Sequence, residues 1–469
     1  MASAARTIDI AAFIDGRKLG RFNYKLIALS WLITVFDGFD MMMISFTAPW
    51  MRDELALDTL MLGHIFSAGL LGMMLGGFAF AYIGDRIGRR QTIIWAAFAF
   101  GILTTATAFA RSYEALMVLR FLDGFAIGGM LPLAWALNIE YVPAKLRSTV
   151  VTVIMMGYSL GTAMAGPVTI WLAPMWGWEG VFIFGGVGTL ICAVGLLLWL
   201  PESVRFLASK GQKPGVIATT LNQIDPALHA TPADNFTLGD EKRDMSNFTV
   251  GKLFKADLKW LTPFLWLGYI ASTLAVYFKA NWGPIVYEDL QFSRETAAYV
   301  SSISGMLGAV LGLVLMRFTD RMGPYAVAVY PLIAFPLLLA VGLIPMSETM
   351  FLILSVTSTS FVGGAHFGIL SIAGVYYPSA IRANGAGWAT SIAKIGGIAG
   401  PIIGAYVLAS GLPIVRSFAI LALCPAVLAL CVIGIGAIVR RREATTVQGV
   451  APVHEAAPAH GATGAAAAE

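Results

Sequence analysis

Charged side chains are scarce in this sequence. Asp, Glu, Lys and Arg make up only 12% of its 469 residues, whereas 58% are hydrophobic; soluble globular proteins carry about a quarter charged residues. With a mean hydropathy of +0.76, the composition excludes an ordinary soluble domain and predicts a chain that lies in a lipid bilayer. Helices are expected there, because backbone groups exposed to lipid must form hydrogen bonds within their own segment.

Several functional signatures are also missing. The three cysteines, Cys192, Cys424 and Cys431, lie in apolar stretches, so a disulfide framework is not indicated. The sequence has no G-x-x-x-x-G-K-[ST], no H-E-x-x-H and no C-x-x-C. We therefore expect no enzyme, no cofactor or metal site and no nucleic-acid partner. Residues Met1 to Asn23 are polar and lack the apolar region of a signal peptide, so the first span is expected to stay in the mature protein.

Long apolar runs recur along nearly the whole chain. Each is long enough to cross about 30 Å of hydrocarbon, which takes about 17 to 25 helical residues. The sequence thus predicts an all-α membrane protein with twelve transmembrane helices in two six-helix bundles. The expected spans are residues 25–50, 60–83, 91–110, 114–140, 149–173, 180–200, 260–283, 297–317, 325–345, 350–376, 387–409 and 414–439.

The placement of Lys and Arg predicts the orientation. Basic residues precede span 1 and follow spans 2, 4 and 12, whereas the opposite loops are acidic or nearly uncharged. Because cytoplasmic loops carry an excess of Lys and Arg, we expect both termini and the long loop 203–259 in the cytoplasm. The predicted location is the inner (plasma) membrane.

Two halves of the chain echo each other. "GDRIGRR" after span 2 corresponds to "RFTDRMGP" after span 8, and "EYVPAKLRSTV" after span 4 corresponds to "YYPSAIRANGAG" after span 10. Repeated halves with a site near the midplane are a transporter architecture. The predicted domains are a cytoplasmic segment 1–24, an N-terminal bundle 25–202, a cytoplasmic linker 203–259, a C-terminal bundle 260–439 and a disordered, low-complexity tail 440–469.

Two carboxylates interrupt span 1. Asp37 and Asp40 are three residues apart in "VFDGFD" and so share a helix face. Asp37 lies about 18 Å along the span from Lys25, near the midplane. Burial and a neighbouring carboxylate both disfavour the ionised form, so we expect at least one of the pair to carry a proton in transport. The alternative is that they form a structural ion pair.

Cations that could face these carboxylates occur in other spans. Arg120, in the outer half of span 4, is the first candidate for holding the acid group of a substrate or an aspartate, and the alternative is an ion pair with Asp123, three residues on. Lys394 is a candidate for substrate contact, but both it and Lys279 have the alternative of reaching toward a membrane surface. His366 is a candidate donor or proton relay, with ordinary packing as the alternative.

Aromatic residues on the same spans fit a planar ligand, because a ring that bears a carboxylate needs both an apolar wall and a cation. Ordinary packing is the alternative, since Phe, Tyr and Trp make up 12% of the chain. The candidates for substrate binding are Trp135, Tyr277 and Trp282, besides Phe36, Phe39 and Phe367. In the loop after span 2, Gly88 permits a tight turn and the charged residues can bind neighbouring helix ends; that predicted gating loop comprises Asp85, Arg86, Gly88, Arg89 and Arg90.

These motifs resemble the major facilitator superfamily over about residues 22 to 440. "DGFD", together with "RFLDGFAIGGMLPLAWALNIEYVPAKLRSTV", is similar to its aromatic acid:proton symporter branch, whose members carry acids such as 4-hydroxybenzoate, protocatechuate and vanillate. One departure is Ala81, where the family has a glycine before the loop aspartate. The resemblance implies that spans 1, 4, 7 and 10 line a central cavity and that "GDRIGRR" helps to close its cytoplasmic side.

The resemblance further implies proton-coupled import of a small aromatic carboxylate by alternating access. The expected partners are that acid, protons and membrane lipid, and we expect a monomer. The alternatives are a symporter of a non-aromatic organic acid such as a dicarboxylate, a proton-driven drug exporter, and a sensor on a transporter scaffold. A sensor would need a large signalling domain, for which the linker and the tail are too poor in apolar residues.

Overall fold

The computed structural model describes residues 6–239, 250–255, 258–377 and 381–449 of the chain. Long helices make up most of them. The first group, called the N half here, consists of α2 (Arg21–Leu55), α3 (Thr59–Ile87), α4 (Arg89–Thr107), α5 (Tyr113–Gly128), α6 (Met130–Glu140) and α7 (Arg147–Trp199). The second group, the C half, consists of α10 (Leu258–Asp289), α11 (Arg294–Met322), α12 (Pro324–Leu343), α13 (Glu348–Tyr376), α14 (Arg382–Ala409), α15 (Arg416–Leu421) and α16 (Leu423–Gly449).

The helices account for the twelve predicted spans. Ten helices among the described residues are long and apolar enough to cross a membrane. One of them contains α7, whose 53 residues would extend about 80 Å as a single helix. Its backbone leaves helical geometry at Trp176 and at Gly177, which has φ +67°, so α7 turns back and supplies two spans. The remaining span is α4, with 19 residues.

Local signals explain why corresponding helices of the two halves begin and end where they do. Asp58 and Ser112 accept hydrogen bonds from the first turns of α3 and α5, and Ser293 and Ser347 do the same for α11 and α13. Such N-caps satisfy backbone donors that have no partner within the helix. Gly88 between α3 and α4, and Gly323 between α11 and α12, both have positive φ. The sequence repeat is therefore also a repeat of helix boundaries.

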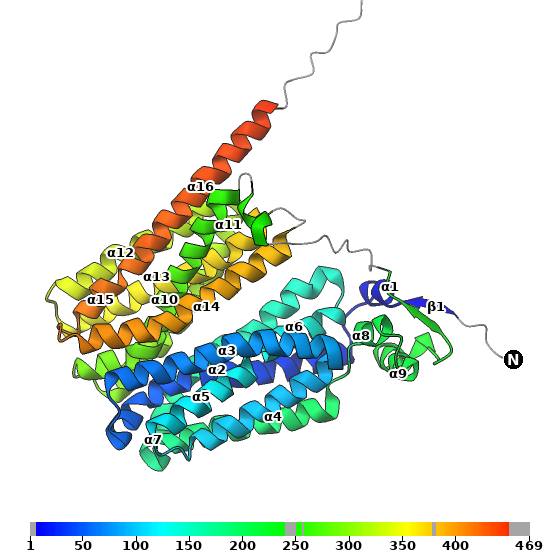
Figure 1. Ribbon diagram of the computed structural model, residues 1–469, viewed down its shortest axis with the longest axis horizontal. Helices are drawn as coiled ribbons and strands as arrows, with labels where there is room; N and C mark the ends of the chain where they lie inside the picture. Colours follow the sequence, from blue (N-terminus) through cyan, green and yellow to red (C-terminus); the bar gives the residue numbers. More distant parts are fainter. Residues whose placement is uncertain (1–5, 240–249, 256–257, 378–380, 450–469) are drawn as a thin grey trace, which may run out of the picture.

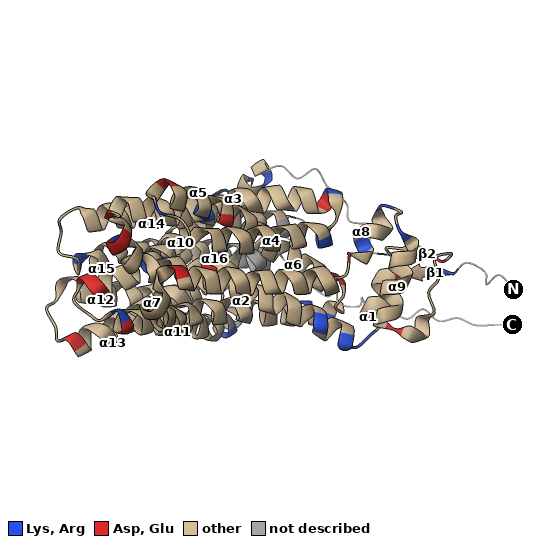
Figure 2. Ribbon diagram, turned by 90° about the horizontal axis from the view of Figure 1, so that it is seen from below, with Lys and Arg blue, Asp and Glu red and all other residues tan. Residues whose placement is uncertain are grey.

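The two halves lie side by side and their ribbons diverge toward the end of the bundle that holds α1, α8 and α9 (Figure 1). We call this the linker end and the opposite one the far end. Charged residues gather at both ends, with few between them (Figure 2). Polar contacts between the halves include Ser45 with Asn281 and Ser67 with the carbonyl of Ile398. At the far end, Arg52 contacts Asp289.

A small folded unit occupies the linker end, where the sequence predicted only a terminal segment and a polar linker. It contains β1 (Thr7–Asp9), α1 (Ile10–Asp15), α8 (Val204–Ser209), α9 (Pro214–Ile224) and β2 (Asn235–Thr237), together called the linker-end unit. The two strands pair in parallel, with Ile8 opposite Phe236. Ile10 and Ile14 are buried in the same apolar cluster as Ile217 and Leu221.

Ion pairs tie this unit together and to the bundle. Arg17 pairs with Asp225, and that contact holds the pKa of the Asp225 carboxyl below its usual value. Asp15 accepts a hydrogen bond from the backbone of Ala144, just before α7. At the other end of the chain, α16 continues to Gly449, ten residues past the predicted end of span 12, and residues 450–469 of the predicted tail lie outside the described residues.

The apolar contact between terminal segment and linker is testable. Ile10→Asp places a charge at a side chain that is 0% exposed and removes burial worth about 1.5 to 3 kcal/mol. We expect a protease to cleave residues 204–238 of this variant at least several-fold faster than those of the parent protein, as measured by limited proteolysis. Ala12→Asp, at an exposed position of α1, is the control and should not differ from the parent.

Candidate functional site

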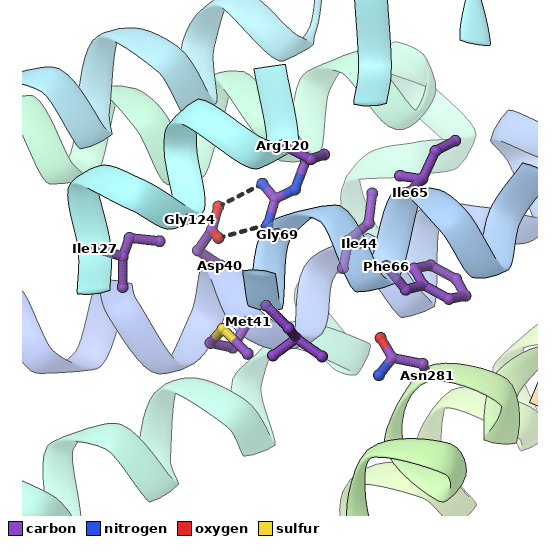
Figure 3. A pocket seen from close by; sticks show the side chains of 11 residues that line it. Asp40, Met41, Ile44, Ile65, Phe66, Gly69, Arg120, Gly124, Ile127 and Asn281 are labelled. Atoms are coloured by element: carbon purple, nitrogen blue, oxygen red, sulfur yellow. Dashed lines mark hydrogen bonds and ion pairs between the residues drawn. The ribbon is translucent and has the colours of Figure 1, made fainter. Parts of the chain in front are cut away.

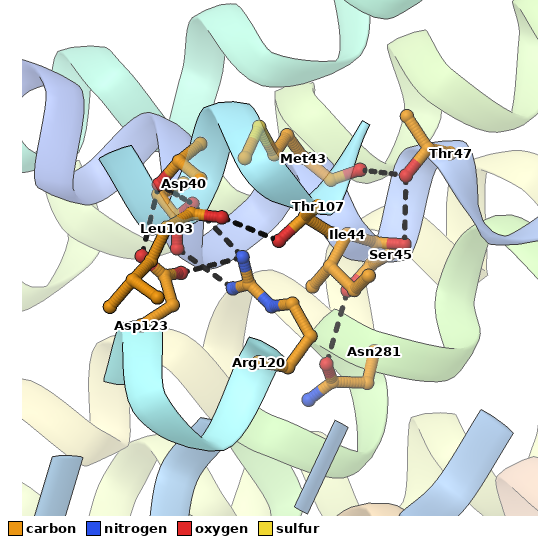
Figure 4. A network of polar contacts seen from close by, with 11 residues as sticks. Asp40, Met43, Ile44, Ser45, Thr47, Leu103, Thr107, Arg120, Asp123 and Asn281 are labelled. Atoms are coloured by element: carbon orange, nitrogen blue, oxygen red, sulfur yellow. Dashed lines mark hydrogen bonds and ion pairs between the residues drawn. The ribbon is translucent and has the colours of Figure 1, made fainter. Parts of the chain in front are cut away.

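A buried network of charges joins α2, α4 and α5 in the middle of the N half (Figure 4). The Arg120 guanidinium binds Asp40 through two contacts, Nη2 to Oδ2 at 2.8 Å and Nη1 to Oδ1 at 3.1 Å, and Nη1 also contacts Asp123 Oδ2 at 2.7 Å. Thr104 Oγ1 donates to Asp123 Oδ1 at 3.0 Å. All four side chains are buried. The two alternatives for Arg120, an aspartate of span 1 and Asp123, are therefore realised together.

Asp37 differs sharply from its neighbour Asp40. Its side chain is 0% exposed, and neither carboxylate oxygen has a hydrogen-bond partner among the described residues. The hydroxyl groups of Tyr158 in α7 and Tyr277 in α10 lie close enough to Asp37 for electrostatic interaction with its carboxylate. A buried polar group without a partner is costly, and an ionised one far more so. In this conformation Asp37 is thus the one member of the predicted pair that has no structural ion pair in the described chain.

Glycines set the close approach of the helices that carry these groups. A Cβ on Gly38 would collide with the backbone of Tyr158, and one on Gly161 with the backbone of Val35, so α2 and α7 touch nearly backbone to backbone beside Asp37. Gly72 and Gly124 likewise bring α3 and α5 together one turn from Arg120. Small residues at such interfaces are typical of tightly packed membrane helices.

A narrow pocket opens beside the network (Figure 3). Asp40 and Arg120 contribute its polar lining, Ile65 and Phe66 of α3 belong to its apolar lining, and Asn281 approaches from α10 of the C half. Ser45 Oγ donates to Asn281 Oδ1 at 3.1 Å. The charged network of the N half therefore borders the contact between the two halves.

The candidate residues of the C half lie apart from this network. His366 Nδ1 is 2.9 Å from Ser272 Oγ, which gives the imidazole a polar partner on α10. Lys394 is twelve residues into α14, about 18 Å from its start, and its Nζ lies 3.2 Å from where a Cβ on Gly77 of α3 would stand. Lys394 thus reaches toward the other half rather than toward a membrane surface, contrary to the alternative considered above.

The three aromatic candidates have different surroundings. Tyr277 lies near Asp37, as described above. Trp282 is fully buried, donates from Nε1 to the carbonyl of Pro401 at 2.9 Å and packs edge-on against Phe66 at 5.4 Å, so it fills the contact between the halves. Trp135 packs against the apolar cluster of Val142, Val150 and Ile154. It is fifteen residues, about 22 Å along the helices, from Arg120.

The predicted gating loop forms a second charged cluster, at the linker end of the N half. Arg89 pairs with Glu140 of α6. Arg90 donates to the carbonyls of Leu200 and Leu197, both at 2.7 Å. Gly88 adopts φ +107°, Arg86 stacks on Tyr82, and Asp85 lies in the last turn of α3, near Arg89. Asp85 was expected beyond the helix end, but α3 continues to Ile87 because Gly88 is the first residue to leave helical geometry.

Ion pairs also join the halves at the far end. Arg52 Nη1 is 3.0 Å from Asp289 Oδ1, and Arg294 Nη2 is 2.5 Å from Asp53 Oδ2. Arg294 also contacts Glu288 at 2.9 Å. By contrast, Arg111 at the same end pairs with Glu54 and Glu179 inside the N half.

The family model of the Major Facilitator Superfamily matches residues 30–401 of the chain. The chain belongs to the major facilitator superfamily. Solved structures with the same fold include a bacterial homologue of the human lysosomal transporter Spinster in an inward-facing and occupied conformation, with a TM-score of 0.67 and 16% identity over 90% of this chain and 98% of that one. At this identity the likeness concerns the fold alone.

Curated relatives of this superfamily member are aromatic acid transporters. A 4-hydroxybenzoate transporter of Pseudomonas putida is 32% identical over 87% of this chain and 91% of its own. A gallate transporter of the same species is 32% identical over 89% and 92%. The 3-(3-hydroxy-phenyl)propionate transporter of Escherichia coli is 29% identical over 82% and 87%. The protein is accordingly a membrane transporter of this branch and not an enzyme.

Several polar residues that support the site were not predicted. Thr104 is one of many threonines on apolar helices, and nothing in the sequence marks it as the donor to Asp123. Glu140 and Glu202 bind the gating loop. Glu140 begins the motif "EYVPAKLRSTV", and Glu202 lies in "PESVRFL", which follows span 6. Each of these glutamates lies at the same end of the N half as the arginine-rich gating loop, and that shared location is the signal from which their role could have been predicted.

The contrast between Asp37 and Asp40 predicts opposite effects on stability. Asp40→Asn removes one partner of a buried guanidinium, which costs about 3 kcal/mol or more in comparable pairs. Asp37→Asn removes a carboxylate that has no partner, so the free energy of unfolding should change by less than about 1 kcal/mol or rise. Thermal unfolding of both isosteric variants in the same detergent measures the difference. Equal destabilisation by the two would contradict the assignment.

Proposed function

We propose that the protein imports a small aromatic carboxylate of the hydroxybenzoate type together with one or more protons. Two of its relatives are named as transporters of 4-hydroxybenzoate and of gallate, and we base the proposed substrate class on these names. The observation that carries the proton coupling is Asp37, a carboxylate buried near the middle of α2 for which the described residues provide no hydrogen-bond donor. A group of this kind is stable when protonated and requires water or a cation when ionised.

The paired network and the unpaired aspartate then have separate roles. Asp40, Arg120 and Asp123 satisfy each other and hold α2 against α5 in a fixed arrangement. Asp37 takes up a proton when water reaches it from one side and gives it up on the other. Tyr158 of α7 and Tyr277 of α10 lie near Asp37. We infer that a change in the contact between the halves alters the surroundings of this carboxylate.

Proton coupling supplies the energy that an anion needs to enter a negative cell interior. Moving one charge against the membrane potential costs about 2.3 kcal/mol per 100 mV. One proton makes uptake of a monovalent acid electroneutral, and two make it electrogenic. We place the linker end in the cytoplasm of a cell with the protein in its inner membrane, because the gating loop, the segment 17–21 after α1 and the end of α16 bring Arg and Lys to this end.

Alternating access follows from the distribution of contacts between the halves. Arg52 with Asp289 and Arg294 with Asp53 join α2 to α10 and α11 at the far end. We infer that these pairs hold the far end closed in the conformation described and must separate when the transporter opens outward. The cluster of Arg89, Glu140 and Glu202 lies within the N half and keeps its linker end rigid during that movement. The chain is proposed to work as a monomer.

Uptake measurements test this function. Cells expressing the protein should accumulate labelled 4-hydroxybenzoate but not labelled succinate, and a protonophore should abolish the accumulation. Asp37→Asn should lose accumulation yet still exchange labelled for unlabelled acid, because exchange requires no net proton transfer. Asp58→Asn is the control, since Asn also caps a helix well. Accumulation by Asp37→Asn equal to that of the parent would rule out this aspartate as the coupling group.

The far-end ion pairs give an independent test of alternating access. A cysteine introduced as Ala298→Cys lies buried beside α7 at the far end and reports opening by its reaction with a thiol reagent that does not cross membranes. Arg294→Gln should speed this labelling from outside about two- to five-fold, the effect of an ion pair worth up to about 1 kcal/mol. Arg111→Gln breaks pairs within one half only. Equal acceleration by both would indicate general loosening instead of gating.

A further inference from the structure

The charged side chains within the membrane-spanning helices are unevenly shared between the two halves. The N half buries three carboxylates, Asp37, Asp40 and Asp123, and of these Asp40 and Asp123 contact the buried guanidinium of Arg120. Both terminal nitrogens of Arg120 already contact carboxylates. A substrate anion arriving at Arg120 would meet two carboxylates at hydrogen-bonding distance from the same group, and like charges so close repel strongly. Arg120 is therefore poorly suited to be the first anchor of the substrate's carboxylate.

Lys279 in α10 has no such competitor. No ion pair or hydrogen bond of its ammonium group occurs in the described part of the chain. It lies ten residues before the end of α10 at Asp289, about 15 Å from the far end of the helix. The lysine side chain spans only about 6 Å, so the ammonium group of Lys279 does not reach the end of α10 at Asp289. A lysine without a partner at this depth is a candidate for binding an anion that comes from outside the chain.

Polar groups on the same face of α10 complete a site. Lys279 follows Ser272 by seven residues, two helical turns, and precedes Gly283 by one turn, so the three positions share a face. Ser272 contacts His366 of α13. Ser301 Oγ of α11 lies 3.3 Å from where a Cβ on Gly283 would stand. That hydroxyl is buried and has no hydrogen-bond partner among the described residues.

We propose that Lys279, assisted by the hydroxyl of Ser301, binds the carboxylate of the transported acid in the C half, while Arg120 stays paired with Asp40 and Asp123. This rests on the proposed function for the identity of the acid, but the chemistry requires only a carboxylate. The anion and the proton then occupy different halves of the transporter. The lysine provides a positive charge and the serine provides a hydrogen-bond donor. Together they replace the water molecules that the carboxylate loses on binding.

Binding to the purified protein tests the site. Lys279→Met keeps the length of the side chain and removes its charge, and Lys279→Arg restores the charge. We expect Lys279→Met to raise the Kd for 4-hydroxybenzoate at least ten-fold, Lys279→Arg to recover most of the affinity, and Ser301→Ala to weaken binding two- to five-fold. The uncharged 4-hydroxybenzamide should bind the parent and Lys279→Met alike. Lys259→Met, at an exposed position of the same helix, is the control.

The outcomes separate this proposal from the proposed function. Unchanged affinity for the acid in a folded Lys279→Met protein would overturn the site. Binding of succinate but not of 4-hydroxybenzoate by the parent would reject the aromatic substrate class, and the same variants would then test Lys279 with succinate. Failure of the parent to bind either acid would reject both. Folding is checked by thermal unfolding, in which Lys279→Met should be at least as stable as the parent, because it removes a partly buried amine without a partner among the described residues.

Discussion

An ionised side chain within a membrane protein needs a partner, and the interior of this transporter is arranged around that requirement. Arg120 is held by Asp40 and Asp123, and Asp123 in turn accepts from Thr104. Breaking one contact leaves another charge uncompensated, which is much more costly than the contact itself is stabilising. The network therefore fixes α2, α4 and α5 relative to one another, and it makes the exceptions, Asp37 and Lys279, functionally informative.

Close helix packing is the second constraint, because buried charged side chains can pair only if their helices lie close together. A contact such as that of Asp40 with Arg120 requires two helices to approach within the reach of short side chains. Gly38 and Gly161 bring α2 and α7 together beside Asp37, and Gly72 and Gly124 bring α3 and α5 together beside Arg120, so each helix of the pair is fixed by its own neighbour. Beside Gly38, the Asp37 side chain is 0% exposed in this conformation. Packing thus decides which carboxylate is paired and which one is free to exchange a proton.

Much of the architecture was predictable from the sequence, because apolar length, charge placement and the repeated loops are each local signals. The turn at Trp176 and Gly177 falls between predicted spans 5 and 6, and Arg120 pairs with both of its predicted partners. The linker-end unit was not predictable: β1 and β2 have three residues each and pair across more than two hundred positions. The predicted depth of Lys394 in the membrane was too shallow, because α14 begins at Arg382, whereas the predicted span began at residue 387.

The division of charge between the halves suggests why transport of an acid and a proton is coupled at all. If the substrate's carboxylate neutralises Lys279 in the C half and a proton neutralises Asp37 in the N half, each half loses its unpaired charge only when both ligands are present. A half with an unpaired charge gains stability from water, which favours an open cavity, whereas two neutralised halves can close on each other without burying a bare ion. Coupling then needs no direct contact between proton and acid. It needs only that closure be unfavourable when one of the two is bound without the other.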